Sequence, residues 1–534
     1  MAGRTRAQDR AALPRYGGSA RLAGHDSFGL RSLAGWDDGP RERPLPEPRT
    51  PGGPIAGRPG RLAHLITDRG RARAGGNVSE VIAAIDSYLD GSAVERMEQY
   101  EAFLRIPSIS ALSQHAGDIE EAARFLADAM SAIGLENVEV APTDGHPVVY
   151  ADWLHAEGAP TVLVYGHYDV QPVDPLDLWV RPPFEPRIED GRIYARGAAD
   201  DKGQVHLHLW AARAWLDTQG RLPVNLRYIF EGEEESGSVN FDGWLEGNRH
   251  RLGADLAVIS DSGFFQGNRP AITIGLRGLM YAQIDVSGPS QDLHSGTYGG
   301  LVQNPANALA RILTDLRHED GRVAVPGFYD QVRELTDQER AEFSRLDFDD
   351  AGLAADIGVS VLFGEPGFSS LERRGARPTL DVNGLWGGFQ GEGSKTIIPA
   401  HAHAKISCRL VPDMDPARTF SLVRDHVLAA APPGVVVEVQ LLSSGLWSLT
   451  GIDHPATLAA ARALEEVFGE SPVYLREGGS IPAAASFGSM LGLPVVLLGF
   501  TPPDDHAHSP NEFMRLDNYE GGIRTVARYW EALG

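Results

Sequence analysis

The stretch VNLRYIFEGEEE (Val224–Glu235) joins an apolar run to three consecutive glutamates. A short run that is rich in β-branched and aromatic residues predicts a buried strand. Adjacent carboxylates repel one another, so the end of a buried strand is an unfavourable place for Glu233, Glu234 and Glu235. Either these glutamates form a solvated turn, or a strongly positive group lies opposite them.

Similar strand-like runs lie on both sides of this stretch and alternate with helical patterns. VVYADWL (148–154) and TVLVYG (161–166) precede it, and ADLAVIS (254–260) follows it. Between them, QVHLHLWAARAWLDTQG (204–220) places apolar residues at helical spacing. Strands that alternate with helices predict an α/β fold, in which a mostly parallel sheet is flanked by helices.

The pattern changes near residue 271. LMYAQIDVSGPSQDLHSG and HAHAKISCRLVPDM alternate like strands of a sheet with one open face, and the helical NPANALARILTDL lies between them. We therefore expect residues 77–270 and 477–534 to form the α/β domain and residues 271–476 an inserted, smaller α+β domain. Residues 1–76 are rich in Arg, Gly and Pro without periodicity, which predicts a disordered extension.

Composition narrows the function classes. The net charge of −24 disfavours nucleic acid or an anionic membrane as a partner. No apolar run approaches the ~20 residues of a membrane helix, and the N-terminus has no apolar core typical of a signal peptide. The single cysteine excludes an intrachain disulfide. We therefore expect a cytoplasmic protein.

Five predicted strands each lead into a carboxylate or an imidazole. The residues that follow these strands are His167 and Asp169, Asp200 and Asp201, the glutamates 233–235, Asp261, and His506 with His508. Open α/β sheets bind ligands beyond the carboxyl ends of their strands, so these side chains are expected to share one crevice. Several carboxylates in one crevice require a cation, and mixed His and carboxylate donors suit Zn²⁺, or Mn²⁺ or Co²⁺.

This interpretation gives the glutamate run a function. Two imidazoles and three carboxylates suit a pair of divalent ions that share one bridging ligand, ~3.5–4 Å apart. One glutamate of the run can bind an ion, and its neighbour can act as general base toward the water that the ions activate.

Eight motifs in this order resemble the M20 metallopeptidase family, and within it the carnosinase-like dipeptidases. The resemblance runs from about residue 80 to the C-terminus and rests on GHYDVQP (166–172), ARGAADDKG (195–203), EGEEESGS (231–238), SDSG (260–263), DLHSGTYGG (292–300), KTIIP (395–399), REGGSIP (476–482) and AHSPNE (507–512).

The resemblance implies a role for each residue of the metal site. His167 and Asp261 would bind one ion, Glu235 and His508 the other, and Asp200 would bridge both. Glu234 would be the general base, with Glu233 as the spare glutamate, and Asp169 would orient the His167 ring. The peptide bond between Asp200 and Asp201 would be cis.

The inserted domain resembles the lid of the family, which also forms a homodimer. His294 would reach the partner subunit's active site and stabilise the oxyanion there. Arg409 would hold the substrate carboxylate, for which its planar guanidinium is suited, with Thr396 nearby. The resemblance also implies that one segment binds substrate: Glu477, Gly478, Gly479 and Ser480.

Six further residues of reactive type are predicted to be structural. They are His206, His208, His401, His403, His506 and Cys408. The first pair lies two residues apart on a predicted helix and does not share a face.

The leading hypothesis is a homodimeric dipeptidase with two zinc ions, which cleaves the peptide bond next to a free carboxylate. The nearest alternative keeps the ions and changes the substrate, as an amidohydrolase that deacylates N-acyl or N-carbamoyl amino acids. A binding protein on the same fold without activity is a third hypothesis. It is disfavoured because the chain retains the base and every ligand that the resemblance implies.

Overall fold

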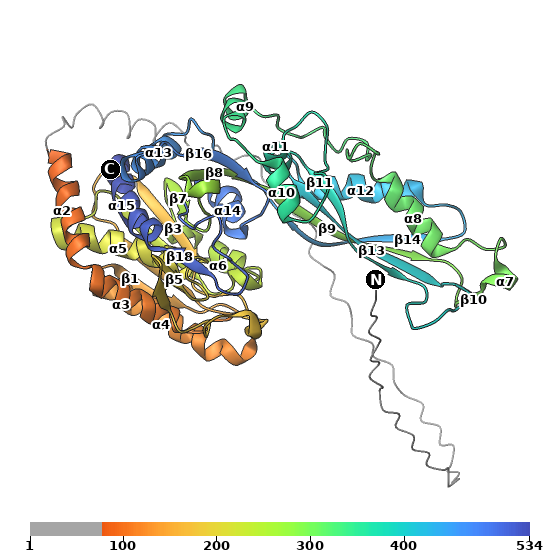
Figure 1. Cartoon of the computed structure of the whole chain (residues 1–534), viewed down its shortest axis with the longest axis horizontal. Helices are drawn as coiled ribbons and strands as arrows, with labels where there is room; N and C mark the ends of the chain where they lie inside the picture. Colours follow the sequence, from red (N-terminus) through yellow and green to blue (C-terminus); the bar gives the residue numbers. More distant parts are fainter. Residues whose placement is uncertain (1–76) are drawn as a thin grey trace, which may run out of the picture. The chain divides into compact units, whose positions relative to one another are not determined.

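A computed structural model describes residues 77–534, which contain two main sheets and the helices that cover them (Figure 1). The predicted disorder of residues 1–76 lies outside the described residues. None of the described helices combines the length and the apolar character that crossing a lipid bilayer requires.

The larger sheet has nine strands in the order β1-β2-β6-β3-β7-β17-β8-β15, with β16 also paired to β8. Its central strands β6, β3, β7 and β17 are parallel, which confirms the predicted sheet type, while the edge pairs are mostly antiparallel. The strands are β1 (Glu136–Ala141), β2 (Val148–Trp153), β3 (Thr161–His167), β6 (Asn225–Glu231), β7 (Leu256–Ile259), β8 (Ala271–Leu276), β15 (Ser448–Leu449), β16 (Val473–Glu477) and β17 (Val495–Leu497).

Helices cover both faces of this sheet, as the alternation of strands and helices predicts. In β3, Val162 and Val164 face one apolar cluster, and Leu163 and Tyr165 face the other. The first cluster includes residues of α2 (Asn77–Gly91), α3 (Ala93–Leu104), α4 (Ala116–Ala132), α5 (Lys202–Gln219), α13 (Pro455–Phe468) and α15 (Leu516–Leu533). The second includes residues of α6 (Phe241–Asn248) and α14 (Pro482–Ser486).

One predicted strand lies elsewhere. The strand predicted before Asp200 and Asp201, in RIYARG (192–197), does not belong to the larger sheet. It is β5 (Arg192–Tyr194) of a three-stranded sheet with β4 (Arg187–Glu189) and β18 (Phe513–Arg515). Because β18 directly follows the AHSPNE motif, this small sheet brings residues 195–200 and 507–512 together.

The second main sheet is antiparallel, in the order β11-β13-β9-β14. Its strands are β9 (Gly278–Ser287), β11 (Thr379–Gly387), β13 (His401–Leu410) and β14 (Val436–Gly445). Helices α8 (Pro305–Asp315) and α12 (Pro416–Ala430) pack on one face (Figure 1). Every second residue of β9 is buried under these helices, which is the alternation that the sequence predicts for a sheet with one open face.

Sheet membership places the domain boundaries inside the predicted ones. We define the small domain as residues 278–445, because β8, β15 and β16 pair within the larger sheet although they fall within the predicted range 271–476. β8 is buried along its whole length, so its apolar run belongs to a covered sheet. Within the small domain, α9 (Asp337–Ser344) and α11 (Ser370–Gly375) pack against β16, and α10 (Asp350–Asp356) lies between them in sequence.

Helix α5 is buried along most of its length and carries His206 and His208, which have structural contacts as predicted. His206 Nδ1 lies 2.7 Å from the Tyr519 hydroxyl, and the His206 ring stacks on Tyr100 with centroids 5.3 Å apart. His208 Nε2 lies 2.7 Å from Ser260 Oγ. Burial lowers the pKa of each imidazole to about 3.

These two histidines predict a loss of stability in acid. In the unfolded chain they titrate near 6.5, so between about pH 6.5 and 3 the unfolded state binds more protons and the free energy of unfolding falls as pH falls. From pH 7 to pH 5, each neutral buried imidazole is expected to cost about 2 kcal/mol. Thermal unfolding in chelator at both pH values should show a smaller pH dependence for His206→Phe than for wild type. His155→Phe, at an exposed histidine, should leave the dependence unchanged. Equal dependence in His206→Phe and wild type would contradict this assignment.

Candidate active site

The five predicted metal ligands meet at the carboxyl ends of the central parallel strands. His167 is the last residue of β3, and Asp261 lies two residues beyond β7. Glu235 lies in the short 3₁₀ helix η3 (Glu234–Ser236), which follows β6. Asp200 precedes α5, and His508 lies in the loop between β17 and β18. Each of the five side chains thus comes from a different segment of the chain.

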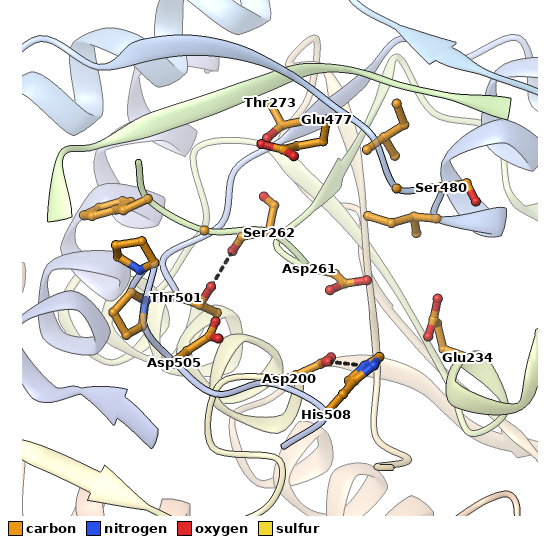
Figure 2. Close-up of a pocket in the computed structure, with 17 residues that line it drawn as sticks. Asp200, Glu234, Asp261, Ser262, Thr273, Glu477, Ser480, Thr501, Asp505 and His508 are labelled. Carbon is orange, nitrogen blue, oxygen red and sulfur yellow. Dashed lines mark hydrogen bonds and ion pairs between the residues drawn. The ribbon is translucent and has the colours of Figure 1, made fainter. Parts of the chain in front are cut away.

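Their donor atoms form two groups that share Asp200. One group contains His167, Asp200 and Asp261, the other contains Asp200, Glu235 and His508, and the donor atoms within each lie within 4.8 Å of one another. Asp200 Oδ1 is 3.0 Å from His167 Nε2, and Asp200 Oδ2 is 3.0 Å from His508 Nε2 (Figure 2). Asp200 therefore presents one oxygen to each group.

The electrostatics of these groups suit divalent cations. Burial and the neighbouring Asp200 raise the pKa of Asp261 to about 7. Hydrogen bonds to Asp200 and Glu235 raise the pKa of His508 to about 10. Burial opposes a charged His167, yet its bonds to Asp169 and Asp200 raise its pKa well above the usual range. All three pKa values are raised, so the site favours additional positive charge. Divalent cations can supply that charge in place of protons.

Glu234 lines the same pocket but belongs to neither donor group. Figure 2 shows its carboxylate directed toward the same opening as the side chains of Asp261, Asp200 and His508. Burial raises the pKa of Glu234 well above that of a free glutamate. Glu233 is bound elsewhere, since its carboxylate accepts hydrogen bonds from His146 N and the Asn240 side chain. A carboxylate beside the ion positions, without a ligand role, is suited to move protons.

Asp169 holds more of the site than the sequence predicts. Its Oδ1 lies 3.4 Å from His167 Nδ1, which fits the expected role of orienting that ring. The same carboxylate also accepts hydrogen bonds from Glu234 N at 3.2 Å and Glu235 N at 3.0 Å. Asp169 therefore fixes the turn that carries both glutamates.

Part of the predicted substrate-binding set lies in the pocket. Glu477, Gly479 and Ser480 line it. Gly478 is adjacent, with its carbonyl accepting a hydrogen bond from Arg277 Nε at 3.2 Å. Arg409 Nη1 donates to Ser480 Oγ at 3.4 Å, which connects the small domain to this segment.

His294 and Thr396 are not among the described residues that line this pocket. His294 ends the short strand β10 (Leu293–His294), which pairs with β12 (Ile397–Ile398) next to Thr396. Its side chain is exposed, and Nδ1 accepts a hydrogen bond from Gly296 N at 2.9 Å. Among the described residues of its own chain, no hydrogen bond or ion pair connects His294 with a predicted metal ligand.

The other residues of reactive type have structural contacts. His403 Nδ1 lies 2.5 Å from Asp285 Oδ1, and His401 Nδ1 lies 3.0 Å from Ser287 Oγ. The His506 ring packs edge-on against Phe513. Cys408 is fully buried in the apolar cluster of the small domain.

Sequence reasoning missed several residues around the site. Thr273, Thr501 and Asp505 line the pocket without a motif that distinguishes them. The peptide bond between Asp200 and Asp201 is cis, as expected. Arg196 and Glu512 lie inside two of the quoted motifs, ARGAADDKG and AHSPNE, yet no role was predicted for either residue.

A family model described as peptidase family M20/M25/M40 matches residues 163–532 of the chain. The chain is 34% identical over 459 residues to the Cys-Gly metallodipeptidase DUG1 of Candida albicans, covering 82% of this chain and 94% of that protein. It is 31% identical over 484 residues to the Beta-Ala-His dipeptidase of Homo sapiens, covering 87% and 95%.

Solved structures of similar proteins agree with this match. The M20 family metallo-carboxypeptidase Sso-CP2 from Sulfolobus solfataricus superposes with a TM-score of 0.73 at 35% identity, covering 82% of this chain and 99% of the other. The di-peptidase Dug1p from Saccharomyces cerevisiae gives a TM-score of 0.70 at 31% identity, covering 85% and 98%. Both similarities cover more than four fifths of this chain.

Proposed function

This chain belongs to peptidase family M20/M25/M40, and we propose that it is a two-metal dipeptidase that cleaves the bond next to a free C-terminal carboxylate. One observation carries the proposal. Asp200 presents a separate oxygen to each of two donor groups, and Glu234 lies unliganded in the same pocket. This arrangement provides two cation positions with a proton acceptor beside them.

The donor groups fit two divalent ions. His167, Asp200 and Asp261 would hold one, and Asp200, Glu235 and His508 the other. Imidazole and carboxylate donors favour Zn²⁺, with Mn²⁺ or Co²⁺ as alternatives. When bound, such a pair polarises the scissile carbonyl and lowers the pKa of water.

The residues of the chain supply the remaining chemistry. The Glu234 carboxylate accepts a proton from the attacking water and then donates it to the departing amine nitrogen. Asp169 keeps Glu234 in place through the Glu234 amide. Arg409 and Ser480, which contact one another, would bind the substrate carboxylate, since a guanidinium can hold a carboxylate through two parallel hydrogen bonds.

The substrate class follows from the relatives. Two of them carry names for Cys-Gly and Beta-Ala-His dipeptides, and they align with most of this chain. The alternative, an amidohydrolase of N-acyl or N-carbamoyl amino acids, requires the same ions and base. The two differ at the substrate amino end, which is a free amine in a dipeptide.

We also propose that the protein is a cytoplasmic homodimer. The exposed His294 lies on the small domain and outside the pocket of its own chain. This placement is consistent with a role in the partner subunit's active site. The single cysteine, buried and unpaired, is consistent with a reducing compartment.

Metal removal and a substrate screen test the proposal together. Dialysis against a chelator should abolish hydrolysis, and Zn²⁺ or Mn²⁺ should restore it, because the ions would polarise the carbonyl and activate the water. The restored protein is then assayed against dipeptides and the matching N-acetyl and N-carbamoyl amino acids. Faster turnover of the dipeptides supports the proposal, and faster turnover of the acylated compounds favours the deacylase. Undiminished activity in chelator would exclude both.

A further inference from the structure

A buried ion pair lies beside the metal ligands without belonging to them. Glu512 is fully buried, and the Arg196 side chain is 1% exposed. Arg196 Nη1 donates to Glu512 Oε2 at 2.7 Å. Both residues lie in motifs that also contain predicted metal ligands, but neither belongs to a donor group.

Glu512 binds the backbone that carries Asp200. Its Oε2 also accepts from Gly197 N at 3.0 Å, and its Oε1 accepts from Ala199 N at 2.8 Å and Asp200 N at 3.0 Å. Its backbone carbonyl accepts from Ala195 N at 3.1 Å. Glu512 therefore accepts backbone hydrogen bonds from four residues of the loop before α5.

The pair connects three ligand-bearing segments. Glu512 follows His508 by four residues in the same loop. Arg196 Nη2 donates at 3.2 Å to the carbonyl of Pro172, which ends the motif that contains His167. One buried contact thus connects the three segments that carry His167, Asp200 and His508.

Buried ion pairs often have only a structural role. Two other buried pairs in this chain differ from Arg196 and Glu512 in what they contact. Arg476 with Glu339, and Arg377 with Glu365, are also largely buried. Their hydrogen bonds reach α9 and residues of the small domain, and none reaches a predicted metal ligand. The Glu512 side chain is different because its accepted bonds end on the Asp200 loop and on Arg196.

We propose that Glu512 and Arg196 are positioning residues, which set the separation of Asp200 from His508 and thereby the affinity for the shared pair of ions. This inference rests on the proposed two-metal site. Neither residue touches substrate or takes part in proton transfer. Their contribution is to keep the two ligands in place before an ion binds, which raises affinity without adding a donor.

Glu512→Gln tests the proposal with little change in shape. The side-chain amide keeps one acceptor, but its NH₂ group must face backbone N–H donors or the Arg196 guanidinium. We expect affinity for Zn²⁺ to fall by about 10- to 100-fold. Metal-free protein is titrated with Zn²⁺ in competition with a chromophoric chelator, and the bound ions per chain are counted by elemental analysis.

The matched control is Glu365→Gln. It removes one carboxylate charge from a pair with a buried arginine, but at a place without a ligand contact. Zn²⁺ affinity should equal that of wild type, even where the thermal unfolding midpoint of the metal-free protein falls as much as in Glu512→Gln. A purely structural role would move the midpoint and leave the affinity of the folded protein unchanged.

Arg196→Lys keeps the test decisive if Glu512→Gln does not fold. Lysine retains the charge, but one ammonium group cannot span Glu512 and the Pro172 carbonyl in the same way as a guanidinium. A weaker Zn²⁺ affinity in folded Arg196→Lys supports the proposal. Two ions bound at wild-type affinity in folded Glu512→Gln, or in Arg196→Lys, would overturn it. Fewer than two ions in wild type would instead overturn the proposed function itself.

Discussion

Glu234→Gln is expected to lower kcat by about 10²- to 10⁴-fold while two metal ions per chain stay bound. The amide has the shape of the carboxylate but cannot accept a proton from water. Glu234 lies outside both donor groups, so its replacement removes no ligand. Steady-state kinetics on a dipeptide, together with elemental analysis of the same sample, separates lost proton transfer from lost metal.

The neighbouring glutamate provides the control. The Glu233 carboxylate accepts bonds from His146 N and Asn240, away from the ion positions. Glu233→Gln should therefore lower the thermal unfolding midpoint and leave kcat within a few-fold of wild type. Near-normal kcat in Glu234→Gln would remove the base assignment, and a large loss only in Glu233→Gln would transfer it.

His294→Ala is expected to lower kcat by about 10²- to 10³-fold, the usual effect of removing one oxyanion donor. This would be a large loss for an exposed residue that does not line the pocket of its own chain. The metal content should be unchanged, since His294 belongs to neither donor group. Asn304→Ala is the control, because the side chains of Asn304 and His294 each accept a hydrogen bond from the backbone N–H two residues on, at the start of a helix.

Mixing two inactive variants distinguishes action across a dimer from a local effect. When His294→Ala and Glu234→Gln subunits exchange, each heterodimer contains one site with an intact base and an intact partner histidine. Random pairing should restore about a quarter of wild-type activity. No recovery, after subunit exchange has been verified by mass, would contradict a shared site.

Much of the site could be predicted because strand exits are local features. The apolar run of β3 and the His167 that ends it are contiguous in sequence, and the same holds for β6 with Glu235 and β7 with Asp261. Parallel neighbours place their carboxyl ends at one edge, so the convergence of these side chains follows from the strand type.

The route to Asp200 could not be predicted in this way. RIYARG has the composition of a strand in the larger sheet, but it pairs with β18, more than 300 residues later in the chain. Nothing within six residues specifies such a partner. The predicted domain boundary at residue 271 differs from the boundary of the larger sheet for the same reason. β8 belongs to the larger sheet because it pairs with β15, β16 and β17, which lie far away in sequence.

Glu512 and Arg196 were missed for a different reason. An acid in a motif is readily interpreted as a ligand or a base, whereas a carboxylate that binds backbone amides leaves no spacing pattern. Its partners, Gly197 N and Ala199 N, belong to residues whose side chains have no chemistry. Such roles become visible only when backbone donors are counted in three dimensions.

The pairing of β8 with β15 has a practical consequence for protein engineering. Leu276 lies opposite Ser448, so the chain leaves the larger sheet and re-enters it on adjacent antiparallel strands. A tight turn of two to five residues, the usual length for a β-hairpin, would therefore suffice to bypass the small domain. The shortened chain would retain all five predicted metal ligands and Glu234, and it would need polar replacements where Val473 and Leu475 lose the cover of Leu371. The contribution of the small domain to hydrolysis could then be measured by comparing the shortened chain with the full one.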